Sequence, residues 1–263
     1  LKNGYRSIKN RVKTSATLSV YFTSIAKQNS RARRILEKNL PSMPVYTHVG
    51  ELQSIVIKTT AKSSQASLVQ AALEDIPELV NFYNNQASQY QFSPVLSADW
   101  LKQIPQNIGL SISDFWLYKT TSGIQACLAL WNQRSFKQIV VRGYRFPLNV
   151  LRIPSNLLAK YFKLPVLPPV DACLKQIYVS FLAIDTAVID KTSTIFANAL
   201  NIARQQGADT CVTGLSVDNP VLPQLKKNFR SYTYSTLIET VNFNRDDGPV
   251  MNSRSVQPEI ALL

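Results

Sequence analysis

The stretch QIYVSFLAIDTAVIDKTSTIFANALNIARQQGADTCVTGLSVDNPVLPQLKKNF, residues 176–229, decides the fold of this chain. Gln176–Ile184 is an apolar run of strand length, and Ser193–Gln206 follows with the apolar spacing of a helix. Thr210–Val217 then predicts a second strand and Val221–Asn228 a second helix. Strands and helices that alternate at this spacing predict an α/β protein, with a mixed sheet covered by helices on both faces.

The neighbouring segments extend this alternation on both sides. Thr233–Phe243 predicts a further strand, and Val256–Leu262 a last short one. A doubly wound nucleotide-binding fold would need a Gly-rich turn after its first strand, and Ala71-Ala72-Leu73-Glu74 provides none. The elements predicted upstream are a strand at Ser67–Ala71, helices at 73–91 and 97–107, a hairpin of Phe115–Lys119 with Ile124–Trp131, and a strand at Ile139–Gly143.

Residues 145–172 contain five prolines among Leu, Val, Ile and Phe, which predicts an irregular, apolar insertion with a short helix at Ser155–Phe162. Its many apolar side chains, Phe146 among them, are too numerous for a free loop. We therefore expect the insertion to roof a cleft. An interfacial membrane contact is the alternative, because Arg145 and Arg152 lie among the apolar residues.

The first 60 residues resemble the second half of another such unit. Thr17–Ile25 and Gln53–Thr60 predict strands, and the segment NSRARRILEKN between them predicts a short basic helix. Residues 17–40 match residues 210–229 in outline, since each has a strand, then an asparagine, then a basic helix. The small polar segment AKSSQAS at 61–67 predicts a linker. The predicted domains are thus a half unit at 1–60 and a complete unit at 68–263.

Composition excludes several classes of protein. Hydrophobic residues make up 45% of the 263, which is enough for a sizeable core. Three scattered cysteines argue against a disulfide scaffold and a zinc site, and they favour a reducing, cytoplasmic location. No apolar run reaches the length of a membrane span, and no signal peptide is recognisable. The start at Leu1 suggests that a segment precedes it.

The net charge of +13 is concentrated near the N-terminus, where residues 1–38 hold ten Lys or Arg and one acid. Such a surface could bind phosphates of a nucleic acid, a lipid or a cofactor. Solvated helix faces are the simpler interpretation, because aromatic residues do not interleave the charges as in a single-strand binder. Nucleic acid is therefore not the expected partner.

The order of elements from residue 67 onward resembles that of the GCN5-related N-acetyltransferases (GNAT), and residues 1–60 resemble the back half of a preceding copy, as in tandem GNAT proteins. The resemblance implies acetyl-CoA or another acyl-CoA as co-substrate, transfer to a small amine, and no metal. It implies a splay between the strands Gln176–Ile184 and Thr210–Val217 that takes the pantetheine arm, with backbone pairing near Leu182 and Ile184.

The family's diphosphate loop would fall on Asp190-Lys191-Thr192-Ser193-Thr194-Ile195-Phe196, at the start of a helix whose N–H groups favour phosphate. Lys191 takes the basic position, while threonines and Phe196 stand where the family has glycine or alanine. The fifth-strand asparagine matches Asn219. The cofactor contacts that the resemblance implies are Leu182, Ile184, Lys191, Thr192, Ser193, Thr194, Ile195 and Asn219.

The family's catalytic tyrosine is missing, because Lys226 and Leu36 occupy its place in the two copies. No general base is evident on the inner part of the fourth strand, and Tyr178 is the candidate for contact with the reacting thioester. Gln133 and Arg134 follow the third strand and are expected to hold the acceptor. The leading hypothesis is acyl transfer to a small amine; the alternatives are an inactive GNAT-like binding module and a basic nucleic-acid-associated protein.

Overall fold

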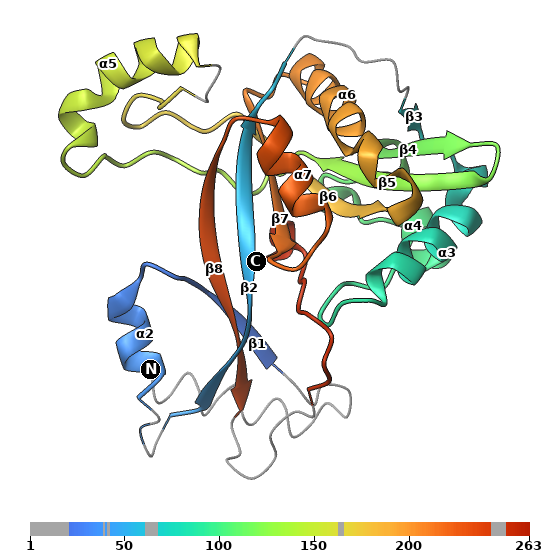
Figure 1. Ribbon diagram of the computed structural model, residues 1–263, viewed down its shortest axis with the longest axis horizontal. Coiled ribbons are helices and arrows are strands. Elements are labelled where there is room, and N and C mark those ends of the chain that lie inside the picture. Colours follow the sequence, from blue (N-terminus) through green and yellow to red (C-terminus); the bar gives the residue numbers. More distant parts are fainter. Residues whose placement is uncertain (1–20, 39, 41–42, 61–67, 163–165, 243–250) are drawn as a thin grey trace.

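The computed structural model describes residues 21–38, 40, 43–60, 68–162, 166–242 and 251–263. Figure 1 shows one open sheet of eight strands, in the order β1-β8-β2-β7-β6-β5-β4-β3, with helices on both faces. The strands are β1 (Tyr21–Ala26), β2 (Val45–Lys58), β3 (Val69–Gln70), β4 (Phe115–Thr120), β5 (Gly123–Trp131), β6 (Gln176–Ile184), β7 (Thr210–Ser216) and β8 (Ser231–Asn242). The α-helices are α2 (Ser30–Leu36), α3 (Ile76–Ala87), α4 (Ala98–Lys102), α5 (Leu148–Tyr161), α6 (Thr192–Gln205) and α7 (Val221–Asn228).

The position of β2 in the sheet is the main topological finding. Although β2 comes from the predicted half unit, it lies between β7 and β8 and is antiparallel to both. β1 pairs with the outer side of β8, so a strand of one part separates two strands of the other. The first 60 residues therefore contribute two strands to the sheet built by the rest of the chain. The boundary at 61–67 lies outside the described residues, and the division into half and complete units stays a prediction.

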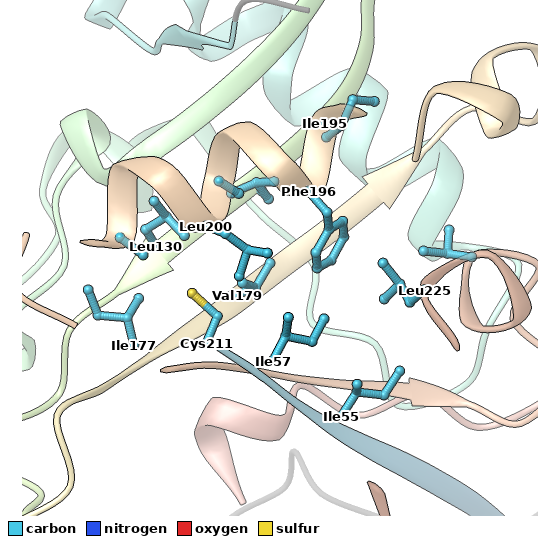
Figure 2. Close-up of a cluster of buried hydrophobic side chains, with 14 of the residues drawn as sticks. Ile55, Ile57, Leu130, Ile177, Val179, Ile195, Phe196, Leu200, Cys211 and Leu225 are labelled. Atoms are coloured by element: carbon cyan, nitrogen blue, oxygen red, sulfur yellow. The ribbon is translucent and has the colours of Figure 1, made fainter. Parts of the chain in front are cut away.

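One face of the sheet is covered by α6 and α7, as the amphipathic spacing of their sequences predicts. Figure 2 shows the core beneath them, to which β2, β6 and β7 each contribute alternate side chains. The fully or almost fully buried members include Ile55, Ile57, Ile177, Val179, Ile195, Phe196, Leu200, Cys211 and Leu225. A second core forms under α3 and α4 on the opposite face and contains Phe115, Leu117 and Phe181.

Several predicted elements need correction. Ile139–Gly143 forms no strand and makes one isolated bridge, between Val140 and Cys173. Val256–Leu262 forms no strand either, since Val256 makes a single bridge to Gln91 and a 3-10 helix, η5, spans Ile260–Leu262. Both segments had the β-branched or apolar content of a strand but no free sheet edge to pair with. Predicted strand Thr17–Ile25 is described only from residue 21 onward.

The insertion does not form the expected roof with its helix. α5 stands apart from the body of the sheet in Figure 1, and most of its apolar side chains are exposed. The helix also begins earlier than predicted, at Leu148, and continues through Pro154. Only the return segment, from Val166 to Gln176, lines a pocket on the sheet.

Candidate functional site

The parallel pair β6 and β7 separates along its length. The two strands pair at Gln176–Thr210, Ile177–Cys211 and Tyr178–Val212, and no pairing continues beyond. A bulge in β6 causes the divergence: Phe181 has a φ of +49°, and the register with β5 shifts there. The predicted splay between these strands is therefore present in the structure. It exposes backbone donors and acceptors to whatever lies between the strands.

The segment 257–261 of the chain itself occupies this splay. A carboxylate oxygen of Glu259 accepts a hydrogen bond from the Phe181 N–H of β6 at 2.7 Å. On the other side, Gln257 Oε1 accepts from Ser216 N–H of β7 at 3.0 Å and from Asn219 Nδ2 at 2.7 Å. The side chain of Glu259 also accepts from the Ala261 N–H at 3.1 Å. The segment thus satisfies donors on both walls of the groove.

Little space remains in the groove beside this segment. Predicted contacts Leu182, Ile184 and Asn219 do come together, around a cavity of about 40 Å³, and Glu259 borders another of about 20 Å³. Each volume accommodates one to a few waters and is too small for a pantetheine arm. Binding of such an arm would require segment 257–261 to move.

Glu259 is the residue that sequence reasoning missed. Burial raises the pKa of its carboxyl, and the hydrogen bonds from Phe181 and Ala261 offset the shift only in part. Its negative charge and burial also raise the pKa of the Tyr83 hydroxyl, burial being the larger cause. No sequence signal marks Glu259, because the stretch Pro-Glu-Ile-Ala was interpreted as part of a strand.

The start of α6 does not form an open phosphate loop. A 3-10 helix, η4 (Thr186–Lys191), runs directly into α6, and the Thr192 N–H already donates to the Ile189 carbonyl. Thr192 and Ile195 are fully buried, whereas Ser193 and Thr194 are partly exposed. Lys191 is exposed, and its ammonium lies 3.2 Å from Asp190. The predicted residues are therefore contiguous, but the geometry offers fewer free donors than the resemblance implies.

Tyr178 lies where the splay begins and borders a large pocket. The pocket has a volume of about 940 Å³ and is lined by β2, β6, β7, β8 and the segment from Val166 to Gln176. Tyr178, Tyr232 and Tyr234 contribute aromatic rings to it. Burial raises the pKa of Tyr178, so its hydroxyl stays protonated at neutral pH. Lys137 Nζ lies 5.6 Å from the centre of the same ring.

The predicted acceptor residues are used for internal contacts. Gln133 is buried and donates through Nε2 to the Ala261 carbonyl at 2.9 Å. Arg134 donates to the carbonyls of Gln206 and Gly207 at 3.2 and 3.3 Å, where α6 ends. This arginine completes the C-terminal cap of the helix. Neither residue lines the large pocket, so neither is placed to hold an acceptor there.

Comparison with known proteins identifies the fold. No family model and no curated protein matches the sequence. The structure superimposes on a GCN5-related N-acetyltransferase from Sphaerobacter thermophilus with a TM-score of 0.57 and 9% identity, covering 96% of this chain and 68% of that one. Further matches are a GNAT-family acetyltransferase from Colwellia psychrerythraea (TM-score 0.43, 12% identity, 84% and 64% covered) and the Saccharomyces cerevisiae N-myristoyltransferase with bound myristoyl-CoA (0.48, 12%, 81% and 57%).

The chain therefore has the GNAT fold, and the predicted α/β class is confirmed. It spans 57% to 68% of the length of these three structures. No helix among the described residues is long and apolar enough to cross a bilayer, and no cluster of potential metal ligands occurs among them.

Proposed function

We propose that the chain is part of an acyl-CoA-dependent N-acyltransferase that transfers its acyl group to a small amine. The splay of β6 and β7 carries this proposal, because it presents backbone groups at the edge where an extended pantetheine arm would bind. The GNAT fold supports the same assignment. In this proposal the arm takes the place of segment 257–261, and it pairs with the backbone near Leu182 and Ile184.

The chemistry assigns a role to each group near the splay. The Phe181 N–H, which the bulge turns into the groove, would donate to the thioester oxygen as negative charge develops on it. The amine would approach through the large pocket and attack the carbonyl carbon. Tyr178, neutral because burial raises its pKa, would donate its proton to the leaving thiolate. The amine would lose a proton to solvent or to Glu259 once that carboxylate leaves Phe181.

A second function is favoured by a specific observation, namely that the groove is already filled. Glu259 and Gln257 occupy the donors that a co-substrate would use, and Lys191 is paired with Asp190. A GNAT-like module that binds no acyl-CoA, and contributes only its large pocket, would have this geometry. Lys191 and Ser193, Thr194 and Ile195 would then have no ligand to bind.

Calorimetric titration of acetyl-CoA distinguishes the two functions. The wild-type chain is compared with Lys191→Ala and with the double variant Gln257→Ala/Glu259→Ala, which frees the donors of Ser216 and Phe181. For the transferase, we expect the double variant to bind more tightly than wild type. A charge-assisted contact is worth roughly 1.5–3 kcal/mol, so Lys191→Ala should bind about ten- to a hundredfold more weakly.

Lys102→Ala is the matched control, because Lys102 is an exposed lysine on α4, away from the groove. Its affinity should equal that of wild type. No heat from wild type or from the double variant at millimolar acetyl-CoA would refute the transferase and leave the binding module. Equal binding by Lys191→Ala and wild type would mean that the diphosphate lies elsewhere.

A further inference from the structure

The helix α5 carries an exposed apolar face. In an α-helix of about 3.6 residues per turn, Val150, Ile153, Leu157 and Tyr161 fall on one side. Their exposed fractions are 67%, 67%, 65% and 81%. Ala159, on the opposite side, is the one α5 residue recorded as buried among those described. The helix therefore turns its apolar face outward, which is the reverse of a helix packed on its own domain.

α5 is nevertheless held in place by its inner side. The Asn156 amide donates to the Leu167 carbonyl at 2.9 Å and accepts from the Leu167 N–H at 2.8 Å. The Tyr144 hydroxyl donates to the Pro168 carbonyl at 2.6 Å. These contacts fix the helix to the return segment of the insertion. The outward orientation of the apolar face is thus a built feature of the fold.

The surroundings of this face are basic. Residues 139–170 include five Lys or Arg and no Asp or Glu. At the C-terminal end of α5, the Arg230 guanidinium lies 5.0 Å from the centre of the Phe162 ring and donates to the Phe162 carbonyl at 3.2 Å. Arg230 borders a surface hollow with Lys226 and Lys227 of α7. The nearest acid in sequence, Asp171, is paired with Arg142 at 3.0 Å.

We propose that α5 and its flanks, residues 145–162, form a docking surface for an anionic phospholipid bilayer. Apolar side chains surrounded by Lys and Arg are the pattern of helices that lie in the membrane interface. A helix of 14 residues is about 21 Å long, too short for a hydrocarbon core of about 30 Å, so it lies on the membrane. A second copy of the chain fits less well, because it would bring the same basic groups together.

Co-sedimentation of the full chain with vesicles tests the proposal. Phosphatidylcholine vesicles are compared with vesicles that also contain phosphatidylserine. We expect binding to the anionic vesicles only, and binding should weaken as salt rises. Ile153→Glu/Leu157→Glu should abolish it. A basic residue near an anionic surface contributes about 1 kcal/mol, so Arg145→Gln/Arg152→Gln should lower the partition coefficient about 25-fold.

Val95→Glu is the matched control, because Val95 is an 80% exposed apolar residue outside α5 and its flanks. This variant should bind like wild type, and all variants should keep the wild-type Tm. Equal binding to neutral and anionic vesicles would overturn the proposal, as would unchanged binding by Ile153→Glu/Leu157→Glu. A dimer in solution that this double variant dissociates, without vesicle binding by wild type, would also overturn it and assign the face to a protein contact.

Discussion

At the scale of single residues, Glu259 connects the stability of the fold with access to its groove. Its carboxylate bonds to β6 through Phe181 and to its own segment through Ala261. Removal of the charge should therefore change both the pH dependence of folding and the occupancy of the groove. Neighbouring Gln257 makes the equivalent contacts to β7 and to Asn219, and it is uncharged.

We predict that Glu259→Gln flattens the dependence of stability on pH. Burial raises the pKa of Glu259 above its ordinary value in the folded state. A carboxyl with a raised folded pKa contributes stability that is complete below the unfolded pKa and is lost as pH rises through the folded pKa. Relative to Glu259→Gln, wild type should lose stability between about pH 4.5 and neutrality. Thermal melts at several pH values measure this difference, and parallel curves would contradict the prediction.

We also predict that Arg134→Met destabilises the chain by about 1–2 kcal/mol, since it leaves two carbonyls at the end of α6 without their donor. Urea unfolding measures the change. Arg134→Lys should recover only part of it, because a lysine cannot reach both carbonyls as a planar guanidinium does. A substrate-binding arginine would instead change the affinity for acceptor and leave the unfolding midpoint unaltered.

At the scale of elements, the closest contact in the groove is between β7 and η5. A Cβ atom added at Gly214 would lie 2.8 Å from both Cβ and Cδ1 of Ile260. We predict that Gly214→Ala displaces the segment around Ile260 at a cost of about 1–3 kcal/mol. Faster hydrogen exchange of the Phe181 and Ser216 amides would report this displacement. Ile260→Ala added to Gly214→Ala should recover part of the stability; a neutral Gly214→Ala would show that the segment is loosely held.

The sequence predicts the elements that pack by strong periodicity. β6 and α7 have the predicted bounds, and the Asn29 and Ser97 caps accept from Ala32 and Trp100 as expected. Gly207 has a φ of +77° at the end of α6, the role for which glycine is suited. Such features are local, so a single sequence contains them.

The predictions that failed depended on long-range contacts. Whether residues 256–262 form a strand depends on whether a sheet edge is free, and β2 has already filled the place between β7 and β8. Gln133 and Arg134 follow the predicted third strand correctly, yet their partners lie on η5 and at the end of α6. The splay between β6 and β7 was expected, but the occupant of the splay was not.

At the scale of the whole molecule, residues 1–60 and 68–263 are joined by strand pairing. β2 pairs with β7 over Leu52–Lys58 and with β8 over Val45–Ile57. Asn29 and Asn219 each accept from a main-chain N–H at the start of their helix, α2 or α7, which agrees with the proposed internal repeat. The two parts are therefore interleaved in the sheet, whatever their evolutionary relation.

We predict that a chain lacking residues 1–60 does not fold cooperatively, because both β7 and β8 would present an unpaired edge to solvent. Urea unfolding followed by circular dichroism should show a broad, early transition or aggregation. A peptide of residues 43–60, added in trans, should restore a cooperative transition. A shuffled peptide of the same composition is the control. A truncated chain with the full chain's Tm would show that β2 is dispensable.

The place of β2 also sets the order in which the molecule can assemble during translation. Ile57 of β2 pairs with Ser231, 174 residues later in the chain. At synthesis rates of roughly 5–20 residues per second, the strand waits on the order of 10–30 s for this partner. Through that time Ile55 and Ile57, fully or almost fully buried in the finished protein, lack their β7 and β8 neighbours. The nascent chain therefore needs protection from aggregation, and the sheet closes only when nearly all of it has left the ribosome.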